Sequence, residues 1–192
     1  MNERDYKKII EKQEKTINDY KLEVDLLKKQ LLYYKKAAYT DSLTNLGNRR
    51  SLENIGKYDC VILGDIDHFK KINDEYGHNI GDQVLVEISE IFRKLVRESD
   101  FVCRWGGEEF VILLKNCNDN NAYKKTLKLK EEISKLSKKF GFKISMSFGI
   151  SHSIENEPLA VAIEKADKAM YKSKENGRNT ITIYKLTKSI DF

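Results

Sequence analysis

Long apolar runs and paired cysteines are both missing from this chain of 192 residues. No apolar stretch approaches ~18 residues, so we expect neither a transmembrane helix nor a signal peptide. The three cysteines, Cys60, Cys103 and Cys117, show no CxxC spacing, and two of them lie in apolar runs typical of strands. Free thiols in a reducing cytoplasm fit this pattern better than disulfides or a zinc site.

A strong excess of one charge is also missing. The net charge is +5, from 35 basic and 30 acidic residues. The lysines between positions 124 and 139 fall in a helical pattern, which favours a solvated helix face over a nucleic-acid patch. With 40% hydrophobic and 34% charged residues, the composition predicts a soluble globular domain with a long exposed helix.

Residues 1–40 contain no glycine or proline and repeat apolar residues every seven positions. The first positions of the repeat are Ile10, Ile17, Val24, Leu31 and Ala38, and the fourth positions are Gln13, Tyr20, Leu27 and Tyr34. This heptad pattern predicts a coiled-coil dimerisation helix over 1–40, and β-branched residues at three first positions favour a parallel pair. A single amphipathic helix that packs on its own domain is the alternative.

The stretch RWGGEEF, from Arg104 to Phe110, stands between two apolar runs. Two apolar runs joined through Gly-Gly predict a β-hairpin, and the glycines let a ligand approach the backbone closely. The adjacent carboxylates Glu108 and Glu109 suit a hard cation such as Mg²⁺. From these residues alone, a solvated acidic turn explains the stretch about as well as a metal site does.

A second pair of carboxylates follows the apolar run at residues 60–63, which we interpret as a buried central strand. Asp65 and Asp67 come just after it, and the end of a central strand is a common position for a metal ligand. The alternative is an N-cap for the next helix, which suits Asp67 well and Asp65 less well.

The GGEEF sequence of residues 106–110 resembles the signature of the GGDEF family of diguanylate cyclases. Residues 65–85, DIDHFKKINDEYGHNIGDQVL, match the family pattern DxDxFKxxNDxxGHxxGDxxL at every specified position. Residues 41–50, DSLTNLGNRR, resemble its opening segment DxLTGLxNRR, with Asn45 in place of the usual glycine. Residues 166–179, ADKAMYKSKENGRN, resemble its closing motif.

The element order expected after residue 40 is strand, helix, helix, hairpin, helix, strand, helix, strand. This order predicts an α+β domain over residues 41–192, with the helices on one side of the sheet. The resemblance implies a palm-like fold of the nucleotidyl-cyclase or ferredoxin-like kind, in which helices flank a central antiparallel sheet. The long coiled-coil helix would precede it.

The resemblance also implies a set of site residues. Asp65, Glu108 and the Ile66 carbonyl look like ligands of Mg²⁺ or Mn²⁺, and Glu109 would bind a second metal or accept a proton. The implied GTP-binding residues are Phe69, through its backbone, and Lys70, Asn73, Asp82, Lys174 and Arg178. The implied reaction joins two GTP molecules into cyclic di-GMP in a homodimer, with one GTP per domain.

Residues Arg97 and Asp100 resemble the family's RxxD site, at which cyclic di-GMP inhibits the enzyme. The alternative is an ordinary ion pair at a helix end. Three other functions stay open at this stage: a non-catalytic receptor for GTP or a cyclic dinucleotide, a cyclase that also accepts ATP, and a coiled-coil interaction protein.

Overall fold

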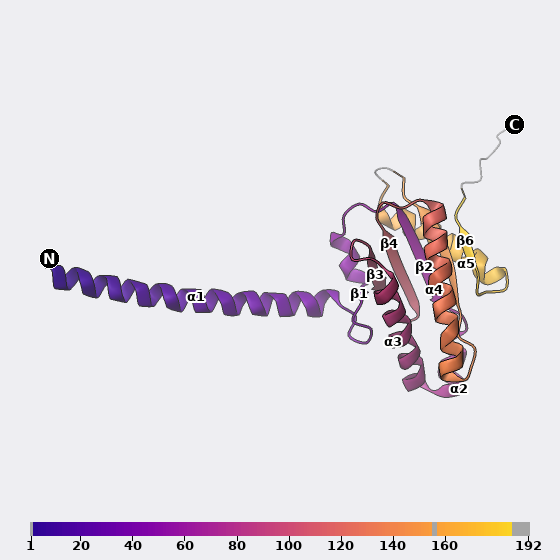
Figure 1. Ribbon diagram of the computed structural model, residues 1–192, viewed down its shortest axis with the longest axis horizontal. Helices are drawn as coiled ribbons and strands as arrows, with labels where there is room; N and C mark the ends of the chain where they lie inside the picture. The colour runs from indigo at the N-terminus through magenta and orange to yellow at the C-terminus, as the bar shows by residue number, and fades with distance from the viewer. Residues whose placement is uncertain (1, 155–156, 186–192) are drawn as a thin grey trace. The chain divides into compact units, whose positions relative to one another are not determined.

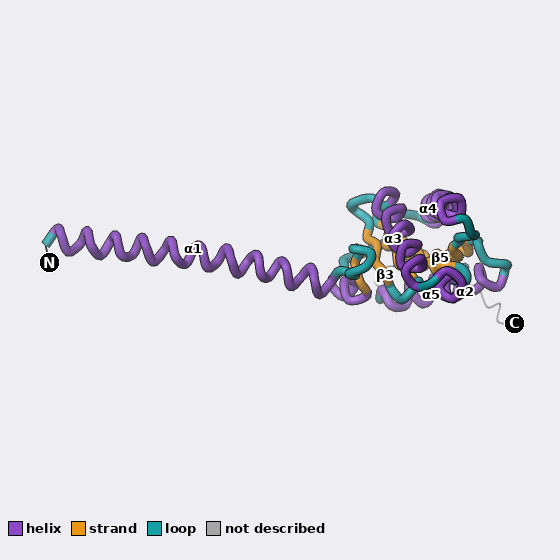
Figure 2. The backbone as a smooth tube through the Cα atoms, turned by 90° about the horizontal axis from the view of Figure 1, so that it is seen from below, coloured by secondary structure: helices purple, strands orange, loops and turns teal. Residues whose placement is uncertain are grey.

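The computed structural model describes residues 2–154 and 157–185 and divides the chain into two compact units, residues 1–39 and residues 40–192. The first unit is a single helix, α1 (Glu3–Tyr39), which runs without interruption (Figures 1 and 2). None of its described residues is buried, and the exposed fractions of Ile17, Leu27 and Leu31 are 52–55%. The heptad stripe of the sequence is thus an uncovered apolar surface in one chain.

The second unit is built on a six-stranded sheet in the order β1-β3-β4-β2-β5-β6. Its strands are β1 (Gly47–Asn48), β2 (Cys60–Ile66), β3 (Phe101–Arg104), β4 (Glu109–Leu114), β5 (Met146–His152) and β6 (Ile181–Ile183). The four central strands pair antiparallel, whereas β1 pairs parallel with β3 and β6 pairs parallel with β5. The predicted α+β class and the antiparallel centre are confirmed.

The helices lie on both faces of the sheet, so the prediction that they share one side is wrong. They are α2 (Phe69–Tyr76), α3 (His78–Leu95), α4 (Asp119–Phe140), α5 (Leu159–Glu175) and the short 3₁₀ helix η1 (Arg49–Asn54). One apolar cluster joins α2, α3 and α4 to the sheet, and a separate cluster joins α5 and η1 to the opposite face. The order of helices and strands along the chain does not show which face of the sheet each helix covers, because β2 is apolar on both of its faces.

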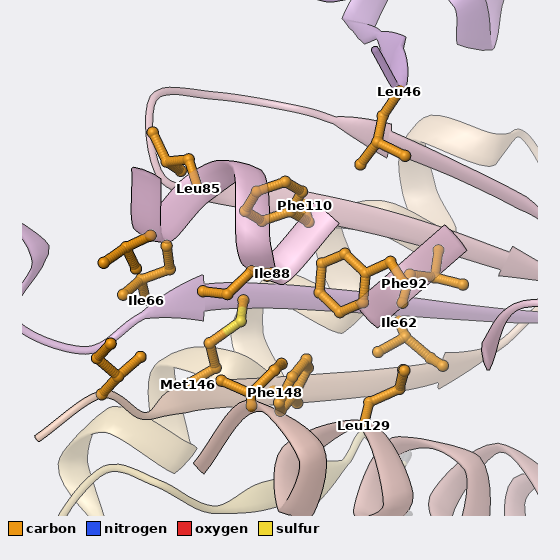
Figure 3. Close-up of a cluster of buried hydrophobic side chains, with 14 of the residues drawn as sticks. Leu46, Ile62, Ile66, Leu85, Ile88, Phe92, Phe110, Leu129, Met146 and Phe148 are labelled. Atoms are coloured by element: carbon orange, nitrogen blue, oxygen red, sulfur yellow. The ribbon is translucent and has the colours of Figure 1, made fainter. Parts of the chain in front are cut away.

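The two faces can be traced along β2, in which all seven residues are buried. Ile62 and Ile66 point into the larger cluster with Phe92, Phe110 and Phe148 (Figure 3). Val61 and Leu63 belong to the separate cluster on the α5 side. A strand that is buried on both faces needs a continuous apolar run rather than an alternating one. The run at residues 60–63 was therefore correctly interpreted as a central strand.

Helix α5 approaches the sheet closely at β5. A Cβ atom on Gly149 would lie 2.0 Å from the Ala166 carbonyl oxygen, so only glycine fits there. Next to it, the Ser151 hydroxyl donates to the Ala162 carbonyl at 2.6 Å. This contact fixes α5 along the sheet and so determines where its C-terminal end, with Lys174, lies.

Within the described residues, no helix is long and apolar enough to cross a membrane. The three cysteines are free, as expected.

Candidate active site

Three carboxylates meet where β2 ends and β4 begins. Asp65 in β2 is the direct cross-strand partner of Glu109 in β4. The Ile66 N–H donates to the Glu108 carbonyl at 3.3 Å, which ties the residue after Asp65 to the residue before Glu109. The two acidic motifs, 43 positions apart in the sequence, therefore form one cluster.

The environment of these carboxylates opposes their negative charge. Burial raises the pKa of Asp65, whose exposed fraction is 5%. Burial, and then the charge of Asp65, raises the pKa of both Glu108 and Glu109. Like charges that are held together out of water favour a cation among them.

Lys174 supplies one positive charge to this cluster. Its Nζ lies 2.8 Å from Asp65 Oδ2, and its charge lowers the pKa of all three carboxylates without cancelling the effect of burial. One ammonium facing three carboxylates leaves the cluster short of positive charge. The oxygen donors, their burial and this charge deficit fit a divalent cation such as Mg²⁺.

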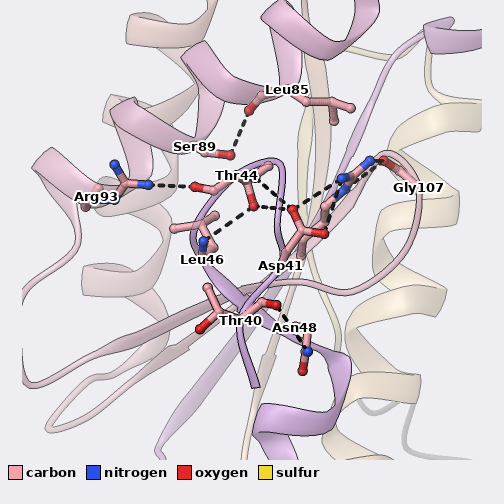
Figure 4. A network of polar contacts seen from close by, with 10 residues as sticks. Thr40, Asp41, Thr44, Leu46, Asn48, Leu85, Ser89, Arg93 and Gly107 are labelled. Atoms are coloured by element: carbon pink, nitrogen blue, oxygen red, sulfur yellow. Dashed lines mark hydrogen bonds and ion pairs between the residues drawn. The ribbon is translucent and has the colours of Figure 1, made fainter. Parts of the chain in front are cut away.

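Residues outside the carboxylate cluster hold the hairpin tip that carries Glu108 in place (Figure 4). Arg104 donates from Nε and Nη2 to the Gly107 carbonyl, at 3.1 and 2.7 Å. Its Nη1 lies 3.3 Å from Asp41 Oδ1, and Asp41 also accepts from the Thr44 N–H and hydroxyl. Burial opposes ionisation of Asp41, but the Thr44 hydrogen bonds and the Arg104 charge together lower its pKa.

Asp67 is not the N-cap of α2. That position is His68, with a φ of 59° and no side-chain capping bond. Asp67 instead accepts from the Ser145 hydroxyl at 2.7 Å, the Ser147 hydroxyl at 2.6 Å and the Asn179 N–H at 2.9 Å. The N-cap interpretation of Asp67 fails because three donors, from Ser145 just before β5, from Ser147 in β5 and from the α5–β6 loop, are a stronger set of partners than one helix N–H.

This network places the loop that carries Arg178. Gly177, Arg178 and Asn179 all have positive φ, of 94, 63 and 51°, and together they turn the chain from α5 into β6. Asp67 accepts a hydrogen bond from the N–H of Asn179, the last of these three residues. The Arg178 charge acts on Asp65 and lowers its pKa, so Arg178 belongs to the electrostatic surroundings of the cluster.

The residues expected to bind GTP lie on α2 and α3, which follow β2. Phe69 is the first residue of α2 and is buried, whereas Lys70 is exposed. Asn73 packs on α3 at Gly81, where an added Cβ would lie 1.9 Å from Asn73 Oδ1. Asp82, the next residue of α3, is exposed. The amide of Asn73 and the turn that carries Asp82 are therefore close together.

Arg97 and Asp100 lie elsewhere, at the turn between α3 and β3. They line one cavity of about 220 Å³ with residues of the β4–α4 loop and α4. Asp100 pairs with Lys125 Nζ and accepts from the Lys115 N–H at 3.2 Å, and its side chain is only 2% exposed. Within the described residues its partner is thus Lys125, and the interpretation of an Arg97–Asp100 ion pair at a helix end is wrong.

Sequence reasoning gave no positioning role to Asp41, Arg104 or Asp67. Asp41 and Asp67 lie inside segments that resemble the family, and Arg104 stands two residues before the GGEEF stretch. Their polar character inside or beside these motifs was the available signal. No sequence pattern shows that Arg104 bonds to both Asp41 and Gly107.

Comparison with known proteins gives a consistent result. The family described as "Diguanylate cyclase, GGDEF domain" matches residues 38–180. Diguanylate cyclase A of Treponema denticola is 37% identical over 129 residues, which cover 65% of this chain and 35% of that protein. Diguanylate cyclase VdcA of Vibrio cholerae is 34% identical over 178 residues, covering 86% of this chain and 52% of that protein.

Solved structures agree with the fold. The coiled coil and GGDEF domain of DgcB from Caulobacter crescentus, in complex with c-di-GMP, has a TM-score of 0.80 at 29% identity, covering 88% of this chain and 98% of that one. An active GGEEF domain of a diguanylate cyclase from Vibrio cholerae has a TM-score of 0.59 at 33% identity, covering 72% and 88%. This chain spans about a third to a half of the length of the curated relatives described above.

Proposed function

This chain belongs to the GGDEF family of diguanylate cyclases, and we propose that it condenses two GTP molecules into cyclic di-GMP and two pyrophosphates. The observation that carries the proposal is the cluster of the buried Asp65 with the half-buried Glu108 and Glu109, beside Lys174. A cluster of three carboxylates that one ammonium does not neutralise suits a metal-assisted reaction on a triphosphate.

We assign the metal-binding role to Asp65, Glu108 and the Ile66 carbonyl. Mg²⁺ or Mn²⁺, when bound there, would act as a Lewis acid toward the phosphates. Glu109 faces Asp65 across the strand pair and is the residue best placed to help bind a second ion or accept the proton of the attacking 3′-hydroxyl.

Phosphate groups would be held at the start of α2 and by two cations of α5 and its loop. The N-cap residue His68 makes no side-chain bond to α2, so the first N–H groups, near Phe69, are suited to phosphate oxygens. Lys70 and Arg178 would add positive charge. Lys174 now pairs with Asp65, and we propose that it transfers to phosphate when a divalent ion neutralises that carboxylate.

The guanine base would be recognised by Asn73 and Asp82. Guanine offers donors at N1 and N2 and acceptors at O6 and N7, so a carboxylate accepts from one edge while an amide bonds donor and acceptor together. The packing of Asn73 on Gly81 brings the amide close to the turn that carries Asp82. Adenine lacks that donor edge, and this arrangement should select against ATP.

One domain offers one such site, whereas the product needs two nucleotides that attack each other. We therefore propose a symmetric dimer in which two domains face one another. The uncovered apolar stripe of α1 supports a coiled coil as the dimerisation element, which would raise the local concentration of the second domain.

We also propose that cyclic di-GMP inhibits the enzyme at Arg97 and Asp100. The supporting observation is that both residues line one small cavity, on the α4 side of the domain. Arg97 can bond the O6 and N7 of a guanine, and Asp100 can accept from its donor edge in exchange for part of its present contacts.

The decisive experiment is incubation of the full chain with GTP and Mg²⁺, followed by chromatography of the products. Cyclic di-GMP and pyrophosphate are expected from the wild type. Glu108→Gln and Glu109→Gln each remove an anionic oxygen and should lower the rate by ~10² or more, with the circular dichroism spectrum unchanged. GTP binding without turnover would favour the non-catalytic receptor, and no nucleotide binding would favour a coiled-coil interaction protein.

A further inference from the structure

A second group of metal-ligand side chains lies at the other end of the sheet. Cys60 opens β2, and its cross-strand partner in β5 is His152. Asp119 opens α4, and Cys117 precedes it by two residues. Cys60 and Asp65 are five residues apart on one strand, which is about 17 Å at the usual rise, so this group is separate from the carboxylate cluster.

The donor atoms of this group converge. Cys60 Sγ lies 3.6 Å from His152 Nδ1, and the same Nδ1 lies 3.8 Å from Asp119 Oδ1. Taken together, the three donor atoms lie within 4.8 Å of one another. Cys117 is not among these converging donors, and its thiol donates to the Asn118 carbonyl at 3.4 Å.

These separations resemble the edges of a tetrahedral zinc site. With Zn–S near 2.3 Å and Zn–N and Zn–O near 2.0–2.2 Å, a tetrahedral angle gives S···N of about 3.5 Å and N···O of about 3.3–3.5 Å. The two distances of 3.6 and 3.8 Å exceed these by up to about half an ångström, and the Cys60 and Asp119 donor atoms lie within 4.8 Å. Rotation of exposed side chains such as His152 and Asp119 is enough to close that difference.

We propose that Cys60, Asp119 and His152 form a binding site for a thiophilic divalent cation of the zinc class, with the fourth coordination position left to water. Sulfur, imidazole nitrogen and carboxylate oxygen are the donor types that such an ion prefers, whereas Mg²⁺ selects oxygen alone. The Cys60–His152 contact is a hydrogen bond, and His152 lies within ion-pair distance of Asp119, so a bound ion would replace both contacts.

The donors lie at different depths, because Cys60 is fully buried whereas His152 and Asp119 are exposed. Metal binding would displace the proton of the Cys60 thiol, because the thiolate is the metal ligand.

An ion at this position would connect three segments that are far apart in the chain: the start of β2, the end of β5 and the start of α4. Cys117, two residues before Asp119, is one of the residues that line the cavity of Arg97 and Asp100. A bound ion would fix that wall of the cavity, which gives the proposed inhibitory site a second means of control.

Titration of the full chain with Co²⁺ tests the site, in the presence of excess Mg²⁺ and a phosphine reductant that prevents disulfide formation. Co²⁺ reports its ligands by its own absorption, so the readout is independent of cyclase activity. We expect one equivalent to give a thiolate-to-cobalt charge-transfer band and the visible bands of a tetrahedral ion, and Zn²⁺ to abolish both. Carboxylates at the other end of the sheet cannot give the thiolate band.

Variants assign the ligands. Asp119→Ala and His152→Ala each change an exposed side chain and should weaken Co²⁺ binding by about tenfold or more without unfolding the domain. Cys103→Ala, which removes a buried cysteine from the opposite face of the sheet, is the matched control and should leave the band unchanged. Absence of a thiolate band in the wild type, or an unchanged Co²⁺ affinity in either Asp119→Ala or His152→Ala, would overturn the proposal.

Discussion

Arg104 lies 3.3 Å from Asp41 and at the same time holds the Gly107 carbonyl with two other nitrogens. Asp41 is the second residue after α1 ends, and Gly107 directly precedes Glu108. One guanidinium thus links the start of the second unit to the hairpin tip, through an ion pair between residues 63 positions apart in the sequence.

Arg104→Lys should slow cyclisation because a lysine keeps the charge but cannot bond both partners with a planar fork. We expect a loss of roughly tenfold to a hundredfold in initial rate, the scale of a small misplacement of reacting groups. Arg50→Lys, an exposed change in η1, is the control. A normal rate in Arg104→Lys with an intact circular dichroism spectrum would show that the link has no role in catalysis.

Glu108→Gln should stabilise the metal-free protein at neutral pH. The folded-state pKa of Glu108 is raised above its ordinary value of 4.5, so the folded state binds the proton more tightly than the unfolded state does. Stability from this group is complete below 4.5 and is lost as the pH rises through the raised folded pKa. Glutamine does not titrate and avoids that loss.

The measurement is the melting temperature of both proteins against pH, without divalent ions. The difference between variant and wild type should be near zero at acidic pH and should grow across this window. Glu98→Gln, at an exposed position outside the cluster, should show no such trend. A difference that is flat with pH would mean that the Glu108 carboxylate is not destabilised by its surroundings.

Asp82→Ser should reduce the preference for GTP over ATP. A hydroxyl can donate or accept, whereas the carboxylate can only accept, and a polar site built for one donor pattern rejects its analogue strongly. The quantity to compare is the ratio of kcat/KM for the two nucleotides, with Gln83→Ser on the next residue of α3 as control. If Asp82→Ser keeps the wild-type ratio, Asp82 does not read the base.

Deletion of residues 1–38 should lower activity per chain most strongly at low protein concentration, because the coil supplies the local concentration of the second domain. Single substitutions test the coiled coil more directly than the deletion does. Leu31→Asp changes a first heptad position, whereas Leu32→Asp changes the next residue, and both leucines are exposed in a single chain. Only the former should weaken dimerisation in light scattering. A chain that is monomeric at micromolar concentration and fully active would refute the coiled-coil argument.

Arg97→Ala should relieve inhibition by added cyclic di-GMP. The cavity of Arg97 lies away from the carboxylate cluster, so inhibition of the wild type should be non-competitive with GTP. The initial rate before product accumulates should stay within about a few-fold of wild type, as surface changes usually leave it. Lys94→Ala, near the end of α3, is the control. Identical inhibition curves for wild type and Arg97→Ala would exclude this site from feedback.

The sequence by itself determined the elements and the chemistry of the site. Helix α1 was predictable because a heptad repeat without glycine or proline has one stable local structure. The central strand at residues 60–63 and the GGEEF hairpin were predictable because apolar runs and paired glycines act locally. The family motifs identified Asp65, Glu108 and Glu109 as a set before any contact between them was known.

Only the tertiary structure decided which side chains meet. It placed α5 on the face of the sheet opposite α3 and α4. It also showed that Asp67 accepts hydrogen bonds from Ser145 and Asn179, and that Asp100 pairs with Lys125. It also brought Cys60, Asp119 and His152 together, although their spacing shows no metal motif. The physical reason is that these contacts depend on strand pairing and helix placement, which are set by the whole core and not by any local pattern.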